Sequence, residues 1–483
     1  MTTSTTVQPP RGVTGLGALT IQLTAARFRT REGESLLYVA GVLASTVAAA
    51  LALTVAGGTW LFWGRAKHPT GLLAKVIAED ETFHSVTIFY FALAIIACAL
   101  LIPALVNLVA GAAVLGARGR ERRLSALRLL GLSSGDVVRM SLLDATIQAL
   151  IGIVLGSVVY AVTLPLWGNL DMLGMPLTAE EMLLPAWLFA LVVAALLVIV
   201  LFATWRGLRQ GRISPLGVAR RANKPGLSAI RGVLFVAVVV GAVVVTALTK
   251  PGSALSQYVI IGGTILAVIV GINLVSPWLL QLEARVTAKL PWPSVMWASR
   301  RIVADPAATW RRVSGLAVLA FIGGYLALMP IAISSSPEQS ETIRTFADKA
   351  QWDFTKGAII TLAVGFVLTA TSVLITQASA TIERAEQSRA LHRMGAPNGF
   401  SLRVMWLETF APLVMAVVLS AGMGLLLALP MHKLARNMGV DTGNGMALMG
   451  AVLVAGLVLA ALSLLASHPL YRSLLGRSER AND

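Results

Sequence analysis

A series of long apolar stretches limits what this chain can fold into more than any other feature of its sequence. Hydrophobic residues make up 56% of the 483 residues and charged residues only 13%, whereas a soluble domain carries about 25% charged residues. About 20 apolar residues in a helix cross the hydrocarbon core of a bilayer. We therefore predict an all-α polytopic membrane protein with about ten transmembrane helices. The predicted spans are residues 36–57, 86–116, 140–165, 183–204, 232–249, 258–280, 313–334, 357–379, 404–429 and 446–467.

Basic residues stand in short clusters between these stretches, which argues against nucleic-acid binding as the reason for the net charge of +16. With ten spans, alternate connecting segments lie on one side of the membrane, and those on the side of the termini hold 30 of the 39 Lys and Arg residues. Because Lys and Arg are retained in the cytosol, we predict that both termini are cytosolic. The basic segments are 1–35, 117–139, 205–231, 281–312, 380–403 and 468–483.

The loops on the other side are short. The two longest, Gly58–His84 and Ser335–Lys356, have fewer than thirty residues each, which is too few for an independent domain core. Each has apolar residues at helical spacing, so we predict one short surface helix in each loop. The apolar sides of these helices consist of Leu72, Leu73, Val76 and Ile77, and of Ile343, Phe346 and Trp352.

An internal repeat relates the two halves of the chain. A shift of 264 residues places 117–144 on 381–408 with seven identical residues in 28, and Asp144 then falls on Glu408. Two four-helix repeats in the same orientation, joined by a two-helix connector, imply a pseudo-twofold axis along the membrane normal. The predicted domains are a cytosolic amphipathic segment (1–35), the first repeat (36–231), the connector (232–280), the second repeat with its preceding cytosolic segment (281–475) and a tail (476–483).

The segment after the second span of each repeat is the main candidate for function. The second apolar stretch is too long for one crossing, so its C-terminal part is expected to project into the cytosol. There, leucines line one side of a predicted helix and arginines the other, and Gly131 is expected to end it. Such a helix suits docking into a groove on a partner. Topology alone would explain the arginines, but it does not explain why Ala-Leu-x-x-x-Gly recurs in both halves.

We call these two stretches the coupling segments. Their predicted docking residues are Arg120, Arg122, Arg123, Leu124, Leu127, Arg128, Leu130 and Gly131 in the first, and Arg384, Arg389, Leu391, His392 and Gly395 in the second.

The pattern Glu-Arg-x-x-x-x-Leu-Arg-x-x-Gly at 121–131 resembles the FtsX-like, MacB-type family of ABC transporter permeases. The Pro-x-x-x-x-Arg pattern at 215–220 is also similar, and the resemblance extends over about 20–231 and 292–475. It implies that a separate cytosolic ATPase dimer binds ATP and Mg, and that the coupling segments transmit its motion. One chain with two repeats would then bind two ATPase subunits. Ten-span members carry a large external domain that this chain lacks, so their substrates are not carried over.

The sequence offers no catalytic, cofactor-binding or metal-binding residues, and we predict that the chain is not an enzyme. It has no Gly-x-x-x-x-Gly-Lys-Ser/Thr motif. Its one cysteine, Cys98, and its five histidines show no ligand spacing.

Two further pairs are predicted from the repeat. Gly152 and Gly156 in the third span, and Ala416 and Ser420 at the equivalent positions, have the spacing that lets helices approach closely. Asp144 and Glu408 are expected to pair with nearby arginines or to act as helix-start charges.

The function predicted from these observations is export or extraction of an amphiphilic, lipid-like or peptide compound, with membrane lipid as a further partner. Two alternatives stay open. An ion-coupled secondary transporter fits less well because the repeat has four spans and the interior lacks central ionisable residues. The other is a signal transmitter that moves no cargo.

Overall fold

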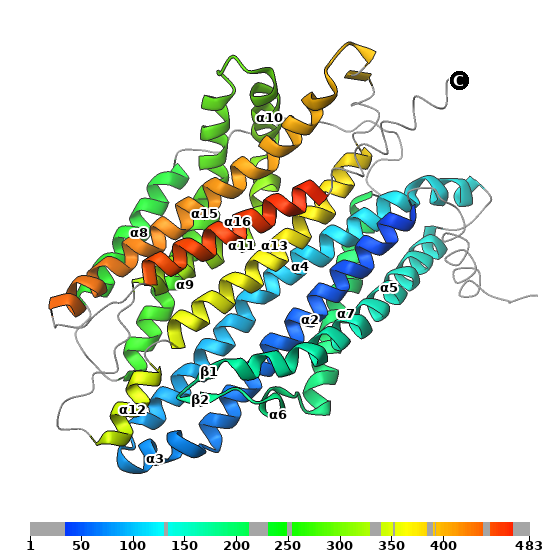
Figure 1. Ribbon diagram of the computed structural model, residues 1–483. Coiled ribbons are helices and arrows are strands. Elements are labelled where there is room, and N and C mark those ends of the chain that lie inside the picture. The colour runs from blue at the N-terminus through cyan, green and yellow to red at the C-terminus, as the bar shows by residue number, and fades with distance from the viewer. Residues whose placement is uncertain are drawn as a thin grey trace, which may run out of the picture.

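The computed structural model describes residues 34–129, 134–211, 230–248, 254–328, 340–350, 353–383, 390–391, 393–437 and 445–466. Within these ranges, ten helices have 19 or more residues, and most of them run side by side along a common direction (Figure 1). They are α2 (Glu34–Lys67), α4 (Phe83–Leu129), α5 (Ser134–Thr163), α7 (Ala186–Gly211), α8 (Ile230–Leu248), α9 (Ala254–Thr287), α11 (Pro306–Ala327), α13 (Asp353–Glu383), α15 (Asn398–Asn437) and α16 (Gly445–Ala466).

The composition of these helices confirms an all-α polytopic membrane protein. Among the described residues, α2, α5, α7, α9 and α15 each contain a stretch long and apolar enough to cross a membrane, and the other five contain shorter apolar stretches. Large apolar side chains such as Val154, Val162 and Val198 are more than half exposed on the bundle surface. Only a hydrocarbon environment covers such a surface favourably.

The packing of the helices repeats between the two halves of the chain. In the first half, α2 packs against α4 and α5, and α4 packs against α7; in the second, α11 packs against α13 and α15, and α13 packs against α16. The halves meet where α4 contacts α13. At that contact Leu101, Leu105 and Leu108 of α4 share one buried cluster with Leu368 and Ile375 of α13. The arrangement is the one predicted from the repeat in the sequence.

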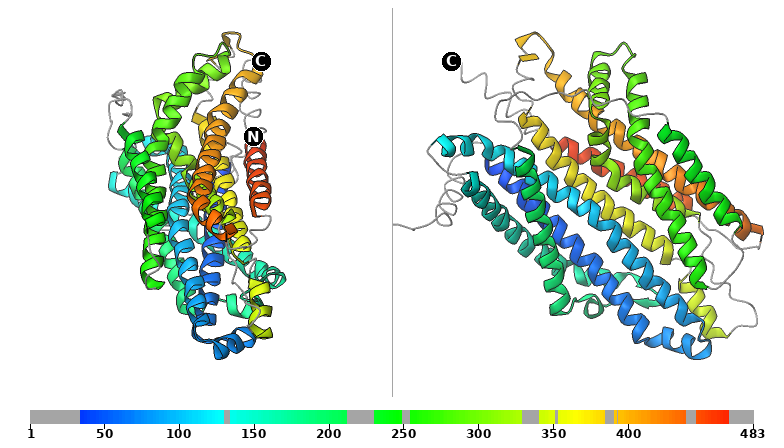
Figure 2. Two further views of the ribbon diagram at one scale, coloured as in Figure 1. Left: turned by 90° about the vertical axis from the view of Figure 1, so that its left-hand side faces the viewer. Right: turned by 180° about the vertical axis from the view of Figure 1, so that it is seen from behind.

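The two connector helices break this symmetry. Helix α8 packs on α9, and α9 packs against α10 (Pro293–Ala304) and α11 of the second half. The views from the side and from behind show α8 and α9 flanking the second half (Figure 2). The connector therefore adds a layer to one half and not to the other.

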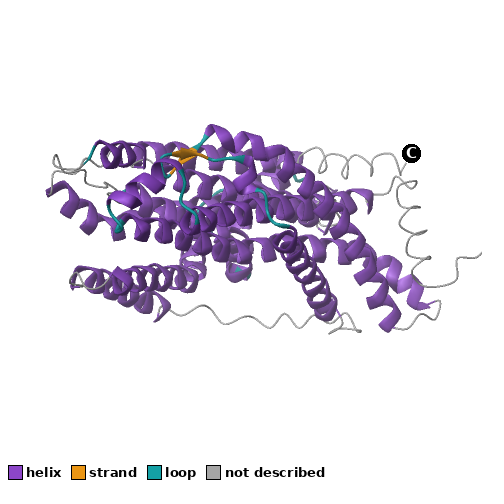
Figure 3. Cartoon of the chain, turned by 90° about the horizontal axis from the view of Figure 1, so that it is seen from below, coloured by secondary structure: helices purple, strands orange, loops and turns teal. Residues whose placement is uncertain are grey.

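Short elements gather at one end of the bundle, and we call them the cap (Figure 1). The hairpin of β1 and β2 is antiparallel, and it turns at Leu173 and Gly174, which have φ of 56° and 72°, the left-handed values of a tight hairpin turn. Figure 3 shows this hairpin among the helices. The cap consists of α3 (Gly71–Glu79), η1 (Leu164–Asn169), β1 (Asp171–Met172), β2 (Met175–Pro176), α6 (Ala179–Met182) and α12 (Glu341–Ala350).

Both predicted surface helices are present as α3 and α12. Leu73 and Val76 of α3 and Ile343 and Phe346 of α12 are buried on their apolar sides. Trp352, which was assigned to the second apolar side, lies outside the described residues, as do residues 1–33 of the predicted N-terminal segment.

The predicted end of the first span is wrong. Helix α2 continues for ten residues past residue 57, to Lys67, because the apolar run resumes with Trp60, Leu61, Phe62 and Trp63 after a pair of glycines. Gly57 permits a close helix contact, since a Cβ there would lie 2.6 Å from the carbonyl oxygen of Met182. Arg65, expected in a loop, therefore lies on the last turns of α2.

Candidate functional site: the coupling segments and the cap

The first coupling segment is a direct extension of a membrane helix. Helix α4 is 47 residues long and ends at Leu129, and α5 begins at Ser134. Residues 120–128, which include six of the predicted docking residues, therefore lie on the last turns of α4. Leu130 and Gly131 lie outside the described residues. The same helix also forms the contact with α13 at the boundary between the two halves.

The second coupling segment ends in a glycine turn. Gly395 has φ of 89°, and the N–H of Ala396 donates to the carbonyl oxygen of Leu391 over 3.0 Å. This six-residue closure is the Schellman helix end, in which glycine takes the left-handed position. Helix α15 then starts at Asn398. Leu391 is half-buried, whereas Arg384, Arg389 and His392 lie outside the described residues.

An ion-pair network lies just past this turn. The buried carboxylate of Glu408 on α15 lies 3.4 Å from Nη1 of Arg301 on α10 and 3.9 Å from Nη1 of Arg312 on α11. Glu408 therefore pairs with arginines as expected. Its counterpart Asp144 is also buried and accepts a hydrogen bond from Nε2 of Gln148 at 3.2 Å.

A small pocket opens beside Glu408. Its lining residues come from α11, α13 and α15, so it lies within the second half. They are Thr309, Arg312, Val313, Val373, Glu408, Thr409 and Pro412.

Hydrogen bonds fasten the connector to the second half. Nε1 of the buried Trp310 on α11 donates to Oδ1 of Asn273 on α9 over 3.0 Å. The hydroxyls of Thr287 on α9 and Ser299 on α10 lie 2.7 Å apart. The helices around the second coupling turn are therefore braced by the connector, an asymmetry between the two segments.

Two of the four predicted packing residues, Gly152 and Gly156, lie at close helix contacts. A Cβ on Gly156 would lie 2.6 Å from the carbonyl oxygen of Thr46, and one on Gly152 would lie 2.9 Å from that of Val42, so both glycines face the backbone of α2. Ala416 and Ser420 on α15 are fully buried, and α15 packs against α11. Sequence reasoning missed Gly324 and Gly424, which face the backbones of α15 and α11 respectively.

The cap contains a buried arginine that the sequence did not single out. Arg65 is only 3% exposed. Its Nη1 donates to the carbonyl oxygen of Met172, and its Nη2 donates to that of Pro176 and to Oε2 of Glu181, each over 2.7 Å. Its Nε donates to Oε1 of Glu181 over 3.3 Å. This one guanidinium thus holds the hairpin and α6 against the end of α2.

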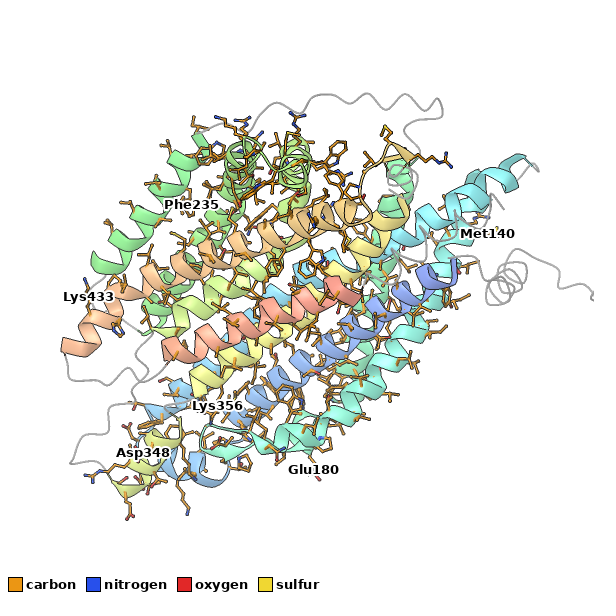
Figure 4. The ribbon with its side chains drawn as sticks, turned by 45° about the horizontal axis from the view of Figure 1, so that its top comes forward. Met140, Glu180, Phe235, Asp348, Lys356 and Lys433 are labelled. Atoms are coloured by element: carbon orange, nitrogen blue, oxygen red, sulfur yellow. The ribbon has the colours of Figure 1, made fainter. Side chains whose placement is uncertain are left out.

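A buried carboxylate joins the hairpin to the second half. Asp353, the first residue of α13, accepts at Oδ2 from the backbone N–H of Leu173 over 2.6 Å and from the hydroxyl of Tyr90 over 3.2 Å. Nζ of Lys356 donates to Oδ1 of Asp353 over 3.4 Å and to Oδ1 of Asp171 over 2.6 Å. Figure 4 shows Lys356 and Asp348 at the cap end and Met140 toward the opposite end.

The acids of the cap have shifted pKa values. Burial raises the pKa of Asp353, and the hydrogen bond from Leu173 with the charge of Lys356 offsets this only in part. Burial also opposes ionisation of Glu181, but the hydrogen bonds and charge of Arg65 outweigh it and hold the pKa of Glu181 below its usual value. The hydrogen bond from Lys356 lowers the pKa of Asp171.

Comparison with known families finds a match that lies within the first half. Residues 104–215 match the model of the FtsX-like permease C-terminal family. The matched segment begins inside α4, includes the first coupling segment and extends just past α7. It includes the motif at 121–131 and supports the resemblance over this part of the chain, while the resemblance of 292–475 stays a prediction. A comparison with curated proteins found no match.

Proposed function

We propose that this chain is an FtsX-like permease, the membrane-spanning subunit of an ABC transporter that is driven by a separate cytosolic ATPase dimer. The match of residues 104–215 to the FtsX-like family and the polytopic bundle support an ABC permease-type membrane protein. The observation that carries it is the continuity of α4, which links the predicted docking surface to the contact between the two halves. In this proposal, a displacement of residues 120–128 is transmitted along α4 to its contact with α13.

The repeat supports two docking points in one chain. The first is the end of α4, and the second is the segment that ends in the turn at Gly395. The end of α4 and the start of α15, which follows the turn, lie at the end of the bundle opposite the cap (Figure 1). The distribution of basic residues favours a cytosolic location for that end, in the plasma membrane of a bacterial cell, with the cap outside. Two docking points would take one ATPase subunit each, and those subunits would bind ATP and Mg.

The proposed cargo is an amphiphilic, lipid-like or peptide compound that is exported or extracted from the membrane. Support comes from the apolar residues at the contact between α4 and α13 and from the apolar surface of the bundle. Vesicles that contain the purified complex test this with a fluorescent lipid added to one leaflet. ATP-dependent movement of the probe is expected, whereas hydrolysis without movement of a lipid or peptide probe would contradict the cargo assignment.

The docking assignment is tested by placing a charged residue on the predicted apolar side of each coupling segment. Leu127→Asp together with Leu391→Asp should leave the protein inserted but abolish its binding of the ATPase, because a carboxylate cannot be buried unpaired in an apolar groove. Ser125→Asp is the matched control, since two residues along a helix turn its side chain about 200° away. Binding by the double variant equal to that of the control would refute the assignment.

A further inference from the structure

In the described part of the chain, apolar and polar contacts join the two halves at the cap. Its buried cluster takes Leu73, Val76, Phe83, Tyr90 and Leu173 from the first half and Ile343, Phe346 and Ala350 from the second. The rings of Phe83 and Phe346 meet edge to face with their centroids 5.8 Å apart. The hydroxyl of Ser340, just before α12, donates to the carboxylate of Glu79 on α3. The two surface helices thus close on each other across the boundary.

The hairpin adds hydrogen bonds between the two halves. Leu173 has a left-handed φ of 56° and is fully buried, a strained conformation for a non-glycine residue that persists only where its surroundings hold it. The same residue donates its N–H to Asp353 of the second half. Lys356 of the second half donates to the side chain and the carbonyl oxygen of Asp171. A strained turn from one half is therefore held in place by groups of the other.

These contacts are of a kind that can be released. The desolvated carboxylate of Asp353 gains hydration when the halves part, and so does the N–H of Leu173, so water replaces much of what is lost. The turn at Leu173 loses its strain at the same time. A purely apolar seam of the same size would have neither compensation.

We propose that the cap is a clasp that holds the two halves together at this end of the bundle and releases when ATP drives them apart. The inference rests on the function proposed above, because the ATPase supplies the work. In the clasped state, the hairpin and α3 of the first half close on α12 and α13 of the second. Release separates Leu173 from Asp353 and α3 from α12, and it opens the boundary beyond the α4–α13 contact.

A disulfide across the clasp reports whether it opens. Cys98 is the one cysteine of the sequence, so Cys98→Ser gives a background without thiols. In it, Gly174→Cys and Lys349→Cys cross the boundary: a Cβ on Gly174 lies 3.8 Å from Cβ of Lys349, the usual separation in a disulfide. The full chain with its bound ATPase is oxidised with copper phenanthroline, once without nucleotide and once after trapping with ATP and vanadate. The cross-linked fraction is followed over time.

Fast cross-linking without nucleotide and about tenfold slower cross-linking after trapping are expected, since release that leaves about one molecule in ten clasped slows bond formation by that factor. Equal cross-linking rates in the two states, with the ATPase bound, would overturn the proposal and show that the cap stays closed when ATP is bound. Each single-cysteine variant controls for bonds between molecules.

A second pair guards against strain at the hairpin tip, because Gly174 has φ of 72°. Glu79→Cys with Ser340→Cys places thiols on α3 and at the start of α12 without a left-handed residue. Because the contact between the native side chains runs through the length of the glutamate, a short bifunctional thiol reagent replaces copper phenanthroline for this pair, and the same slowing is expected. A rate unchanged by trapping at this pair would also overturn the clasp. If no ATPase purifies with the chain, the proposed function fails, and the ATP-driven release fails with it. If the ATPase is bound and the rates stay equal, only the clasp fails.

Discussion

Arg65 donates hydrogen bonds to both carboxylate oxygens of Glu181, which lies 116 residues further along the chain. The pair joins the last turns of α2 to the short helix α6 and encloses the hairpin between them. A guanidinium that is 3% exposed and has four hydrogen bonds is among the most fully engaged groups in the described part of the chain. Two consequences can be measured.

The first concerns the stability of the cap. Arg65→Met keeps much of the unbranched apolar stem of the side chain but leaves two backbone carbonyls and Glu181 without their donor, so the local free energy of unfolding should fall by about 3 kcal/mol. Glu181→Gln retains both carbonyl contacts and, because Glu181 is one-third exposed, should cost about 1 kcal/mol. Hydrogen exchange at the backbone amides of 170–183 measures both values. Equal protection in the two variants would contradict the role given to Arg65.

The second concerns acid. Because the pKa of Glu181 lies below its usual value of 4.5, its ionised form stabilises the cap above that pH, and this contribution is lost as the pH falls through the lowered pKa. Because the pKa of Asp353 is raised, ionisation of Asp353 lowers the stability of the cap as the pH rises. The contribution of Glu181 is therefore measured as the difference in protection between the parent protein and Glu181→Gln. The protection of the cap amides in the parent protein should exceed that in Glu181→Gln at pH 6, and the two should converge below pH 4.5. A constant difference would show that ionisation of Glu181 is not involved.

The glycine turn in the second coupling segment gives a third prediction. Gly395→Ala places a Cβ at a φ of 89°, which should cost about 1–2 kcal/mol and disturb the approach to α15. ATP hydrolysis by the assembled complex is expected to fall several-fold while membrane insertion is unchanged. Gly399→Ala is the matched control four residues on, since a Cβ there meets nothing within 4 Å. Equal loss of hydrolysis in both variants would remove any special role for the turn.

Two glycines of α15 make a matched pair for helix packing. A Cβ on Gly424 would lie 2.7 Å from the backbone nitrogen of Tyr325, whereas one on Gly422 meets nothing within 4 Å. Gly424→Ala should destabilise the detergent-solubilised protein by about 1–3 kcal/mol, and Gly422→Ala should be neutral or slightly stabilising. Thermal melting of the two variants checks this, and equal melting temperatures would contradict the close approach of α11 and α15.

The long membrane helices and the two surface helices of the cap could be predicted from the sequence. The ten long helices follow from apolar length and from the basic segments between them, and α3 and α12 follow from apolar residues at helical spacing, such as Leu73 and Val76. The repeat also placed Gly152 and Gly156 in a stretch that the structure packs against α2. These signals are local, and they are repeated along the chain.

The hairpin and Arg65 could not be predicted because their contacts are distant in sequence. Strands of two residues carry no alternation, and the tip Leu173-Gly174 lacks the Asn-Gly or Asp-Gly signal of a tight turn. Arg65 looks like one more basic residue after a membrane span. Its burial depends on Glu181 and on carbonyls more than a hundred residues away.

The central claim is that one permease chain works with two ATPase subunits. The most direct test is the mass of the intact complex, purified in mild detergent through a tag on this chain from the cells that make it. The account predicts one copy of the 50.8 kDa chain with two copies of a nucleotide-binding subunit. A lone chain, found repeatedly and in several detergents, would contradict it and would favour the secondary transporter.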